Sequence, residues 1–178
     1  MTEPDPPGRG TRFLLRAEAG AVGGLVGAVA VALLFFFERA IHLHPLAVPT
    51  ALASGFLGGA SGASSGSGML GGVSSDLVII LEMLVYTVVH LLTFAAVGFS
   101  AVFVVDGSRF WTSLWGGAAY AGVTCTALLY LVRWIAGTPV ALDVVGLPRV
   151  LLANVLAGAI IGVALYTAEH SGERSTAT

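Results

Sequence analysis

The segment from Ala19 to Phe37 reads AGAVGGLVGAVAVALLFFF and contains no charged residue. A helix rises about 1.5 Å per residue, so about 20 apolar residues cross the hydrocarbon core of a bilayer, which is roughly 30 Å thick. Charged residues flank this segment on both sides, at Arg16, Glu18, Glu38 and Arg39. The segment is therefore predicted to be a membrane-spanning helix.

Three further segments have the same character, and they run from Leu77 to Val105, from Phe110 to Val132 and from Val150 to Ala168. The second of them is interrupted by Glu82 and His90, and the other two are uncharged. Continuous apolar runs lack the alternation of a membrane β-barrel, and open sheets leave backbone groups unpaired in lipid. We therefore expect an all-α fold, an integral membrane four-helix bundle.

The composition supports a membrane protein and excludes several other classes. Of the 178 residues, 56% are hydrophobic and 10% are charged, whereas soluble domains carry about 25% charged residues. The formal net charge of −2 gives no basic surface for nucleic acid. A single cysteine, Cys125, excludes an internal disulfide and a cysteine-based metal cluster, and we expect it to be a small packing residue.

The predicted domain organisation is simple. A disordered N-terminal tail (residues 1–12) precedes one four-span membrane domain (residues 13–170), which contains a Gly/Ser-rich loop at 53–75, and a short C-terminal tail follows (residues 171–178). More arginines lie on the side of the two termini than on the other side, which predicts that both termini are cytoplasmic in the cell (inner or cytoplasmic) membrane. The turn Asp106–Arg109 makes the second and third spans antiparallel neighbours.

Small residues recur at intervals of four on the first and fourth spans, so that each row stays on one helix face. The rows are Gly20 with Gly24 and Gly23 with Gly27 in the first span, and Asn154, Gly158, Gly162 and Tyr166 in the fourth. Glycine lets two backbones approach closely, which drives helix association in lipid. The rows either pack the four helices of one chain or join two copies, in which case Asn154 forms a hydrogen bond between helices.

Polar residues follow one face of the second span, within about 80° of one another, and we call them the polar ladder. They are Glu82, Tyr86, His90, Thr93 and Ser100. An ionisable residue inside a membrane is a functional candidate because its burial is costly. In the alternative, His90 is a neutral packing residue that bonds to Tyr120, Thr124 or Asn154, and Glu82 pairs with Arg133 or extends to water.

Metal and cofactor sites have little support in the sequence. His42 and His44 form a His-x-His pair that, with Asp76 and Glu82, has the donor types for a metal ion, but Pro45 beside them favours a simple turn. Haem or quinone association depends on His90, and bis-His haem ligation needs a second deep histidine, from another copy for example. We predict no metal and no cofactor, and the sequence contains none of the common catalytic motifs.

The segment Tyr86–Gly98 reads YTVVHLLTFAAVG, in which His90, Phe94 and Gly98 recur at intervals of four. It resembles the second helix of an uncharacterised family of small four-span membrane proteins in bacteria. The glycine-rich first helix and Pro49-Thr50 after it are similar to that family as well, whereas the long Gly/Ser segment is not. The resemblance implies a four-helix membrane bundle and implies no activity.

The predicted function is that of a non-catalytic multi-pass membrane protein, which packs as a homo-oligomer or as an accessory subunit of a larger membrane complex. One alternative is a redox or proton-handling membrane subunit that uses His90 and associates with haem or quinone. Another is a small transporter or channel. The expected partners are the lipid bilayer, other copies and subunits of a membrane complex, and no nucleic acid.

Overall fold

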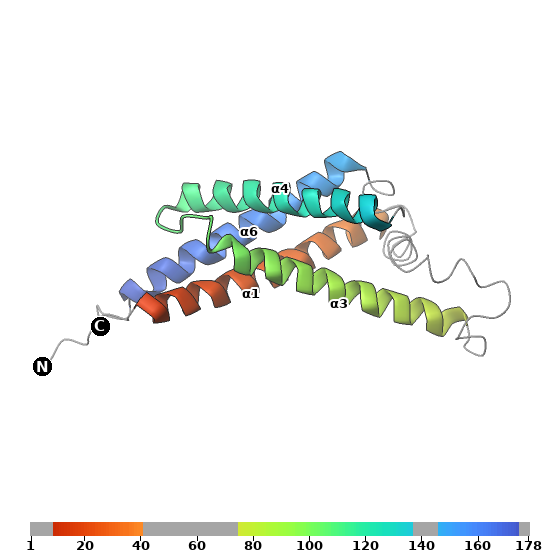
Figure 1. The fold of residues 1–178 in the computed structure, drawn as a ribbon, viewed down its shortest axis with the longest axis horizontal. Coiled ribbons are helices and arrows are strands. Elements are labelled where there is room, and N and C mark those ends of the chain that lie inside the picture. The colour runs from red at the N-terminus through yellow and green to blue at the C-terminus, as the bar shows by residue number, and fades with distance from the viewer. Residues whose placement is uncertain (1–8, 41–74, 137–145, 175–178) are drawn as a thin grey trace, which may run out of the picture.

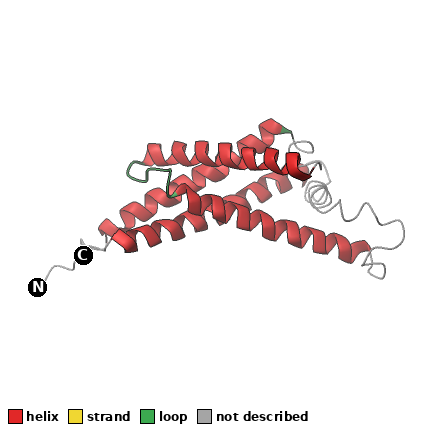
Figure 2. Ribbon diagram, viewed as in Figure 1, coloured by secondary structure: helices red, strands yellow, loops and turns green. Residues whose placement is uncertain are grey.

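The computed structural model of the protein describes residues 9–40, 75–136 and 146–174. Regular structure in these segments is helical throughout and comprises α1 (Arg9–Ala40), α3 (Ser75–Ala101), α4 (Phe110–Ala136) and α6 (Leu147–Arg174) (Figure 2). All four helices are long and apolar enough to cross a membrane. The prediction of an all-helical chain with four helices of membrane-spanning length is confirmed.

The helix bounds differ from the predicted ones at both termini. Helix α1 begins at Arg9, within the predicted tail of residues 1–12, and α6 continues to Arg174, beyond the predicted domain limit at residue 170. Next to both extensions, α1 and α6 are joined to each other and to the end of α3, by Arg16 with Glu169 and by Arg16 with Val105. The length of an apolar run predicts only the part of a helix that lies in lipid. Polar turns beyond that part stay helical where packing against other helices stabilises them.

Helix α3 begins at Ser75, two residues before the predicted span, and ends at Ala101 rather than at Val105. Its last turn tightens, since the amide of Phe103 donates to the carbonyl of Ser100 (3.2 Å) and that of Val104 to the carbonyl of Ala101 (3.0 Å). Such i→i−3 bonds are common where a helix ends. The remaining carbonyl, at Val105, is left for a side chain of another helix.

The four helices form an antiparallel arrangement with two distinct ends (Figure 1). We call the end at which α1 and α4 begin and α3 and α6 end the proximal end, and the opposite one the distal end. Helix α6 lies between α1 and α4, and α3 packs against α1. Towards the distal end α3 diverges from the other three helices (Figure 1).

The α4–α6 contact is built from glycine on both helices. A Cβ atom added at Gly117 would overlap the carbonyl oxygen of Gly158, and one added at Gly158 would overlap the carbonyl oxygen of Gly117. One turn away, a Cβ at Gly162 would overlap the carbonyl of Ser113, whose hydroxyl donates a 2.6 Å hydrogen bond to the Gly162 carbonyl. The two backbones therefore approach as closely as helices can.

Helix α1 uses two glycine rows, one for each neighbour. Gly20 and Gly24 face α3, where a Cβ at either position would overlap the carbonyl of Gly98 or Phe94. Gly27 faces α6, where a Cβ would lie 3.0 Å from the Cβ of Ala157. Of the two alternatives for the glycine rows, the structure places these residues in contacts between helices of one chain.

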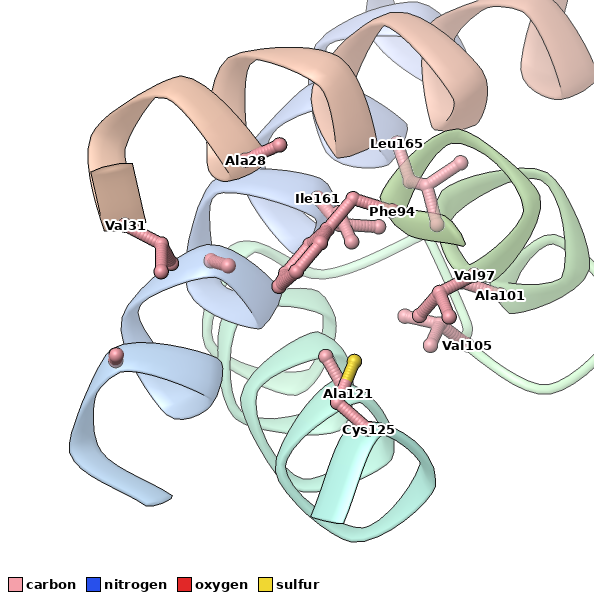
Figure 3. Close-up of a cluster of buried hydrophobic side chains, with 12 residues drawn as sticks. Ala28, Val31, Phe94, Val97, Ala101, Val105, Ala121, Cys125, Ile161 and Leu165 are labelled. Atoms are coloured by element: carbon pink, nitrogen blue, oxygen red, sulfur yellow. The ribbon is translucent and has the colours of Figure 1, made fainter. Parts of the chain in front are cut away.

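The hydrophobic core lies where α3 still touches the other helices. Phe94 extends from α3 into the middle of a cluster of buried side chains (Figure 3). Small residues of the other helices surround it, including Ala28 of α1, Ala121 of α4 and Ala157 of α6, which are fully buried. The same cluster holds the larger side chains Ile161 and Leu165 of α6, so the core combines a few large side chains with several alanines.

Glycine also shapes the start of α6. Gly146 adopts φ 91°, a backbone conformation that strains residues with a Cβ, and its carbonyl accepts the amide of Val150 (3.2 Å). Pro148 lies in the first turn, where its missing N–H would have no helical partner. The sequence Gly-Leu-Pro therefore determines where α6 begins.

Candidate functional site

His90 connects α3 to α1 inside the bundle. Its Nε2 atom lies 3.2 Å from the backbone carbonyl oxygen of Ala28. Because a carbonyl only accepts, Nε2 carries a proton and donates this bond. The predicted partners Tyr120, Thr124 and Asn154 are wrong for this nitrogen, because α3 crosses α1 at this level and not α4 or α6.

Two aromatic rings enclose the imidazole along α3. The ring of Tyr86 stacks on it with centroids 5.8 Å apart, and the ring of Phe94 lies 4.8 Å away on the other side. The spacing of four residues puts the three rings on one helix face. His90 is therefore held in orientation by a hydrogen bond at its tip and by rings on both faces.

The rest of the polar ladder divides among different partners. The hydroxyl of Thr93 donates to the carbonyl of Val89 in its own helix (2.7 Å). Ser100 donates to the carbonyl of Val97 (3.0 Å) and lies 2.8 Å from the hydroxyl of Tyr120, which therefore acts as the donor to Ser100. The ladder is thus no continuous polar route, since one part joins α1 and another joins α4.

Glu82 belongs to α3, two turns before His90, but its side chain lies outside the described part of the chain. The predicted pair between Glu82 and Arg133 stays a prediction for the same reason. His42, His44 and the Gly/Ser-rich loop at 53–75 also fall outside the described residues.

Asn154 is buried within one copy of the chain and has an exposed fraction of 5%. Its Nδ2 atom has no hydrogen-bond partner among the described residues. The chain's own helices cover this side chain, and the expectation that Asn154 bonds across a dimer stays a prediction.

The proximal end contains a polar cluster that the sequence analysis missed. The Nη2 atom of Arg16 donates to the Val105 carbonyl (3.0 Å), and its Nε atom lies 3.3 Å from Oε2 of Glu169. The Nε contact is an ion pair by distance, but its geometry is not that of a hydrogen bond. One arginine thus joins α1, the end of α3 and α6. The available signal was that Arg16 and Glu169 flank the first and fourth spans on the same side.

The turn between α3 and α4 is held by Asp106 beside this cluster. Its Oδ1 and Oδ2 atoms accept hydrogen bonds from the amide and the hydroxyl of Ser108, both at 2.9 Å. These bonds, assisted by the charges of Arg16 and Arg109, lower the pKa of the Asp106 carboxyl below its ordinary value. Gly107 follows and lies against the Leu165 carbonyl of α6, where a larger residue would crowd the contact.

An aromatic group completes the proximal end. The ring of His170 lies 4.2 Å from that of Tyr166 in α6, and Tyr166 packs edge-on against Phe110 of α4 at 5.4 Å. The Nδ1 atom of His170 is 2.9 Å from the Tyr166 carbonyl and donates to it. His170 therefore belongs to the proximal end of the bundle.

The arrangement of His90 does not suit haem. A haem-ligating histidine presents one ring nitrogen to the metal and donates the other to a second group. Here Nε2 donates to the Ala28 carbonyl, so Nδ1 is the nitrogen left to bind an iron. Nδ1 lies beside the residue's own backbone, which leaves little room for a porphyrin. Among the residues that the structure describes, no three His, Cys, Asp or Glu side chains are grouped to hold a metal ion.

Comparisons of the chain with protein-family models, with curated proteins and with solved structures find no match. The resemblance to small four-span membrane proteins of bacteria stays a prediction.

Proposed function

We propose that this protein is a non-catalytic multi-pass membrane protein that acts by lateral association, as a homo-oligomer or as an accessory subunit of a membrane complex. The observation that carries the proposal is the position of α3. Its distal half diverges from the bundle, while the glycine rows of α1, α4 and α6 are used inside the chain (Figure 1). The distal half of α3 is therefore one apolar surface that another membrane helix can reach.

The exposed residues of α3 form a ridge at intervals of four. They are Ile80, Leu84, Val88 and Leu92, with exposed fractions from 47% to 64%. Lipid covers such a ridge in an isolated chain, and a partner helix has to compete with lipid by close packing and by polar contacts. The polar ladder lies on the opposite face of α3, where His90 bonds to α1 and Ser100 to α4, so the ridge itself offers close apolar packing.

Gentle extraction into a mild detergent, followed by native mass spectrometry, tests the proposal. We expect the chain to be recovered as a multimer or together with another membrane protein. A monomer that co-purifies with nothing, from membranes in which the chain is at its natural level, would contradict the proposal.

We also propose that the membrane is the cell's cytoplasmic membrane, with the proximal end in the cytoplasm. The arginine distribution supports this orientation. Single cysteines at Ser108 and Ser171, both exposed at the proximal end, and at Leu147 at the distal end test it in a Cys125→Ala background. An impermeant thiol reagent applied to intact cells should label the Leu147 position, and labelling of the Ser108 position would contradict the orientation.

A second proposal is a redox or proton-handling role for His90, and here a quinone fits better than haem. A quinol hydroxyl can donate to the Nδ1 atom of an imidazole whose Nε2 carries the proton, and the adjacent rings of Tyr86 and Phe94 offer apolar contact to a quinone ring. A bound quinone would supply the electron and proton transfer.

Extraction and analysis of bound lipids from the purified protein separate the two proposals. A co-purified quinone that is lost in His90→Phe, but retained in the control variant Leu92→Phe on the exposed face of α3, would support the role for His90. Protein without a bound quinone, or with one that His90→Phe retains, would remove it.

A transporter or channel is the third candidate. The division of the polar ladder between α1 and α4 gives it less support than a continuous polar route would. Ion flux into liposomes that is unchanged by Glu82→Gln and by His90→Ala would dismiss it.

A further inference from the structure

The two halves of the chain carry the same pattern of residues on successive helices. The α1 stretch Arg16–Ala28 reads RAEAGAVGGLVGA and the α4 stretch Arg109–Ala121 reads RFWTSLWGGAAYA, so that an arginine, a Gly-Gly pair and an alanine recur at the same spacing. The α3 stretch His90–Gly98 reads HLLTFAAVG and the α6 stretch Asn154–Gly162 reads NVLAGAIIG, and both have leucine, alanine and glycine at the third, sixth and ninth positions. These matches align α1 with α4 and α3 with α6.

The structure pairs the two helices of each half in the same register. In the first half, a Cβ atom added at Gly98 would overlap the carbonyl of Gly20. In the second half, a Cβ atom added at Gly162 would overlap the carbonyl of Ser113, and these are the aligned residues. The aligned pairs one turn further also touch through their backbones, and they are Gly24 with Phe94 and Gly117 with Gly158. Sequence and packing together identify a tandem repeat of one helical hairpin, and both copies run from the proximal to the distal end and back (Figure 1).

The contacts between the two hairpins, in contrast, do not match. Helix α1 of the first hairpin packs closely against α6 of the second, where a Cβ atom added at Gly23 would lie 2.8 Å from the Cβ atom of Ala164. The corresponding contact in the repeat is that of α4 with α3, and Gly116 of α4 aligns with Gly23. Among the described residues, a Cβ atom at Gly116 would meet only the side chain of Val105, at 3.4 Å, and α3 contacts α4 only slightly. One of the two equivalent contacts is therefore closed and the other is open.

Tyr120 accounts for the difference, because it stands on α4 where α1 has a glycine. The aligned residue is Gly27, where a Cβ atom would lie 3.0 Å from the Cβ atom of Ala157, so that α1 and α6 approach closely. The side chain of Tyr120 instead extends towards α3, where its hydroxyl lies 2.8 Å from that of Ser100, and it packs against the buried core cluster. Close approach of two membrane helices requires small residues at the contact, and an aromatic ring there prevents it.

We propose that Tyr120 is a spacer, which holds α3 away from α4 and keeps the distal half of α3 apart from the other helices (Figure 1). The contact of α6 with α1 shows how closely the two hairpins approach where a glycine stands in its place. With the ring removed, α3 closes towards α4. The spacer thereby sets how much of α3 another membrane helix can reach, and it acts within one chain whether or not that chain associates with a partner.

Distances between two spin labels on the full chain, reconstituted in phosphatidylcholine bilayers, test this role. Cysteines that carry the labels replace Val88 in α3 and Leu131 in α4, both exposed, in a Cys125→Ala background. Pulsed electron paramagnetic resonance measures the distance between the labels. Tyr120→Ala should shorten this distance by several ångströms, and an unchanged distance would overturn the proposal.

Two controls separate the bulk of the ring from other effects. Tyr120→Phe keeps the ring and loses the hydrogen bond to Ser100, so the distance should stay as it is with Tyr120. A change as large as that in Tyr120→Ala would assign the position of α3 to the hydrogen bond and contradict the spacer. A second pair of labels, at Leu131 and at Leu152 of α6, reports the contact between α4 and α6 and should be unaffected by Tyr120→Ala. An equal shift of both pairs would mean that the ring supports the whole bundle, which would also contradict the proposal.

Discussion

Helices α6 and α3 have nearly equal lengths, 28 and 27 residues, and yet they pack in different ways. Helix α6 lies between two neighbours along its length, with Gly158 and Gly162 towards α4 and Ala157 and Ala164 towards α1. Helix α3 has one glycine, Gly98, and contacts α1 mainly over the half that contains it.

The difference teaches what holds helices together in lipid. Lipid tails are as apolar as leucine, so a large aliphatic side chain gains little by moving from lipid to a neighbouring helix. Close backbone approach gains dispersion contacts that lipid cannot supply, and it requires glycine or alanine on both helices. Helix α3 is the more apolar of the two and is nevertheless the less enclosed.

The largest expected effect comes from adding a methyl group where the glycines of α6 and α4 meet. Gly158→Ala should lower the free energy of unfolding by about 2–3 kcal/mol, because the new Cβ meets the backbone of Gly117, which cannot rotate away. Reversible unfolding in mixed detergent micelles measures the change.

Gly116→Ala is the matched control for that variant. It lies next to Gly117 on α4, but its new Cβ would make an ordinary 3.4 Å contact with Val105. Higher helix propensity should then make the protein equally or more stable, by up to about 1 kcal/mol. Similar losses in both variants would mean that α4 and α6 do not approach as described.

The next effect concerns the proximal end, where α3 rejoins the other helices. Arg16→Met should destabilise the protein by about 1–2 kcal/mol, since it removes the donor to Val105 and leaves Glu169 without its cation. Glu169→Gln should cost less, because the bond to Val105 remains and the ion pair is partly exposed. Equal effects of the two variants, in the same unfolding assay, would assign the whole contribution to the ion pair.

Smaller effects are expected from two single hydrogen bonds, one between α4 and α6 and one between α3 and α4. Ser113→Ala removes the fully buried bond between α4 and α6 and should cost about 1 kcal/mol. Ser100→Ala removes the bond between α3 and Tyr120 and should cost roughly half as much, because this bond is only partly buried. A larger loss in Ser100→Ala would show that α3 is held as tightly as α6.

The smallest effect is the pH dependence of the stability that Asp106 contributes in the turn between α3 and α4. The pKa of Asp106 is lower in the folded protein than its ordinary value of about 4, so its contribution to stability is complete above that value. The contribution is lost as the pH falls through the lowered pKa. Asp106→Asn should remove this acid-side dependence in unfolding curves, and a variant that keeps it would assign the dependence to another carboxyl.

Much of the tightly packed region could be predicted from the sequence. The spacing of Gly20, Gly24 and Gly27 predicted close contacts. The short turn at Asp106–Arg109 predicted that the second and third spans are antiparallel neighbours, but α3 packs chiefly against α1 and contacts α4 only slightly. The contribution of Ser113 was missed, although it lies four residues before Gly117 on the same helix face. A serine in a row of small residues is a signal that sequence reasoning can use.

The loosely packed region could not be predicted in the same way. A helical wheel places His90 and Ser100 on one face, but it does not show that α3 crosses α1 at one level and meets α4 at another. The partner of His90 is a backbone carbonyl, which no side-chain pattern reveals. The role of Arg16 depends on where α3 ends, and apolar length placed that end at Val105 rather than at Ala101.

Photo-crosslinking in native membranes tests most directly the claim that the distal half of α3 faces a partner. A benzoylphenylalanine in place of Leu84, in α3, is compared with one in place of Leu131, an exposed residue in the distal part of α4. Our account predicts a protein adduct of defined mass from the Leu84 position and lipid adducts alone from the Leu131 position. Lipid adducts alone from both positions would contradict it.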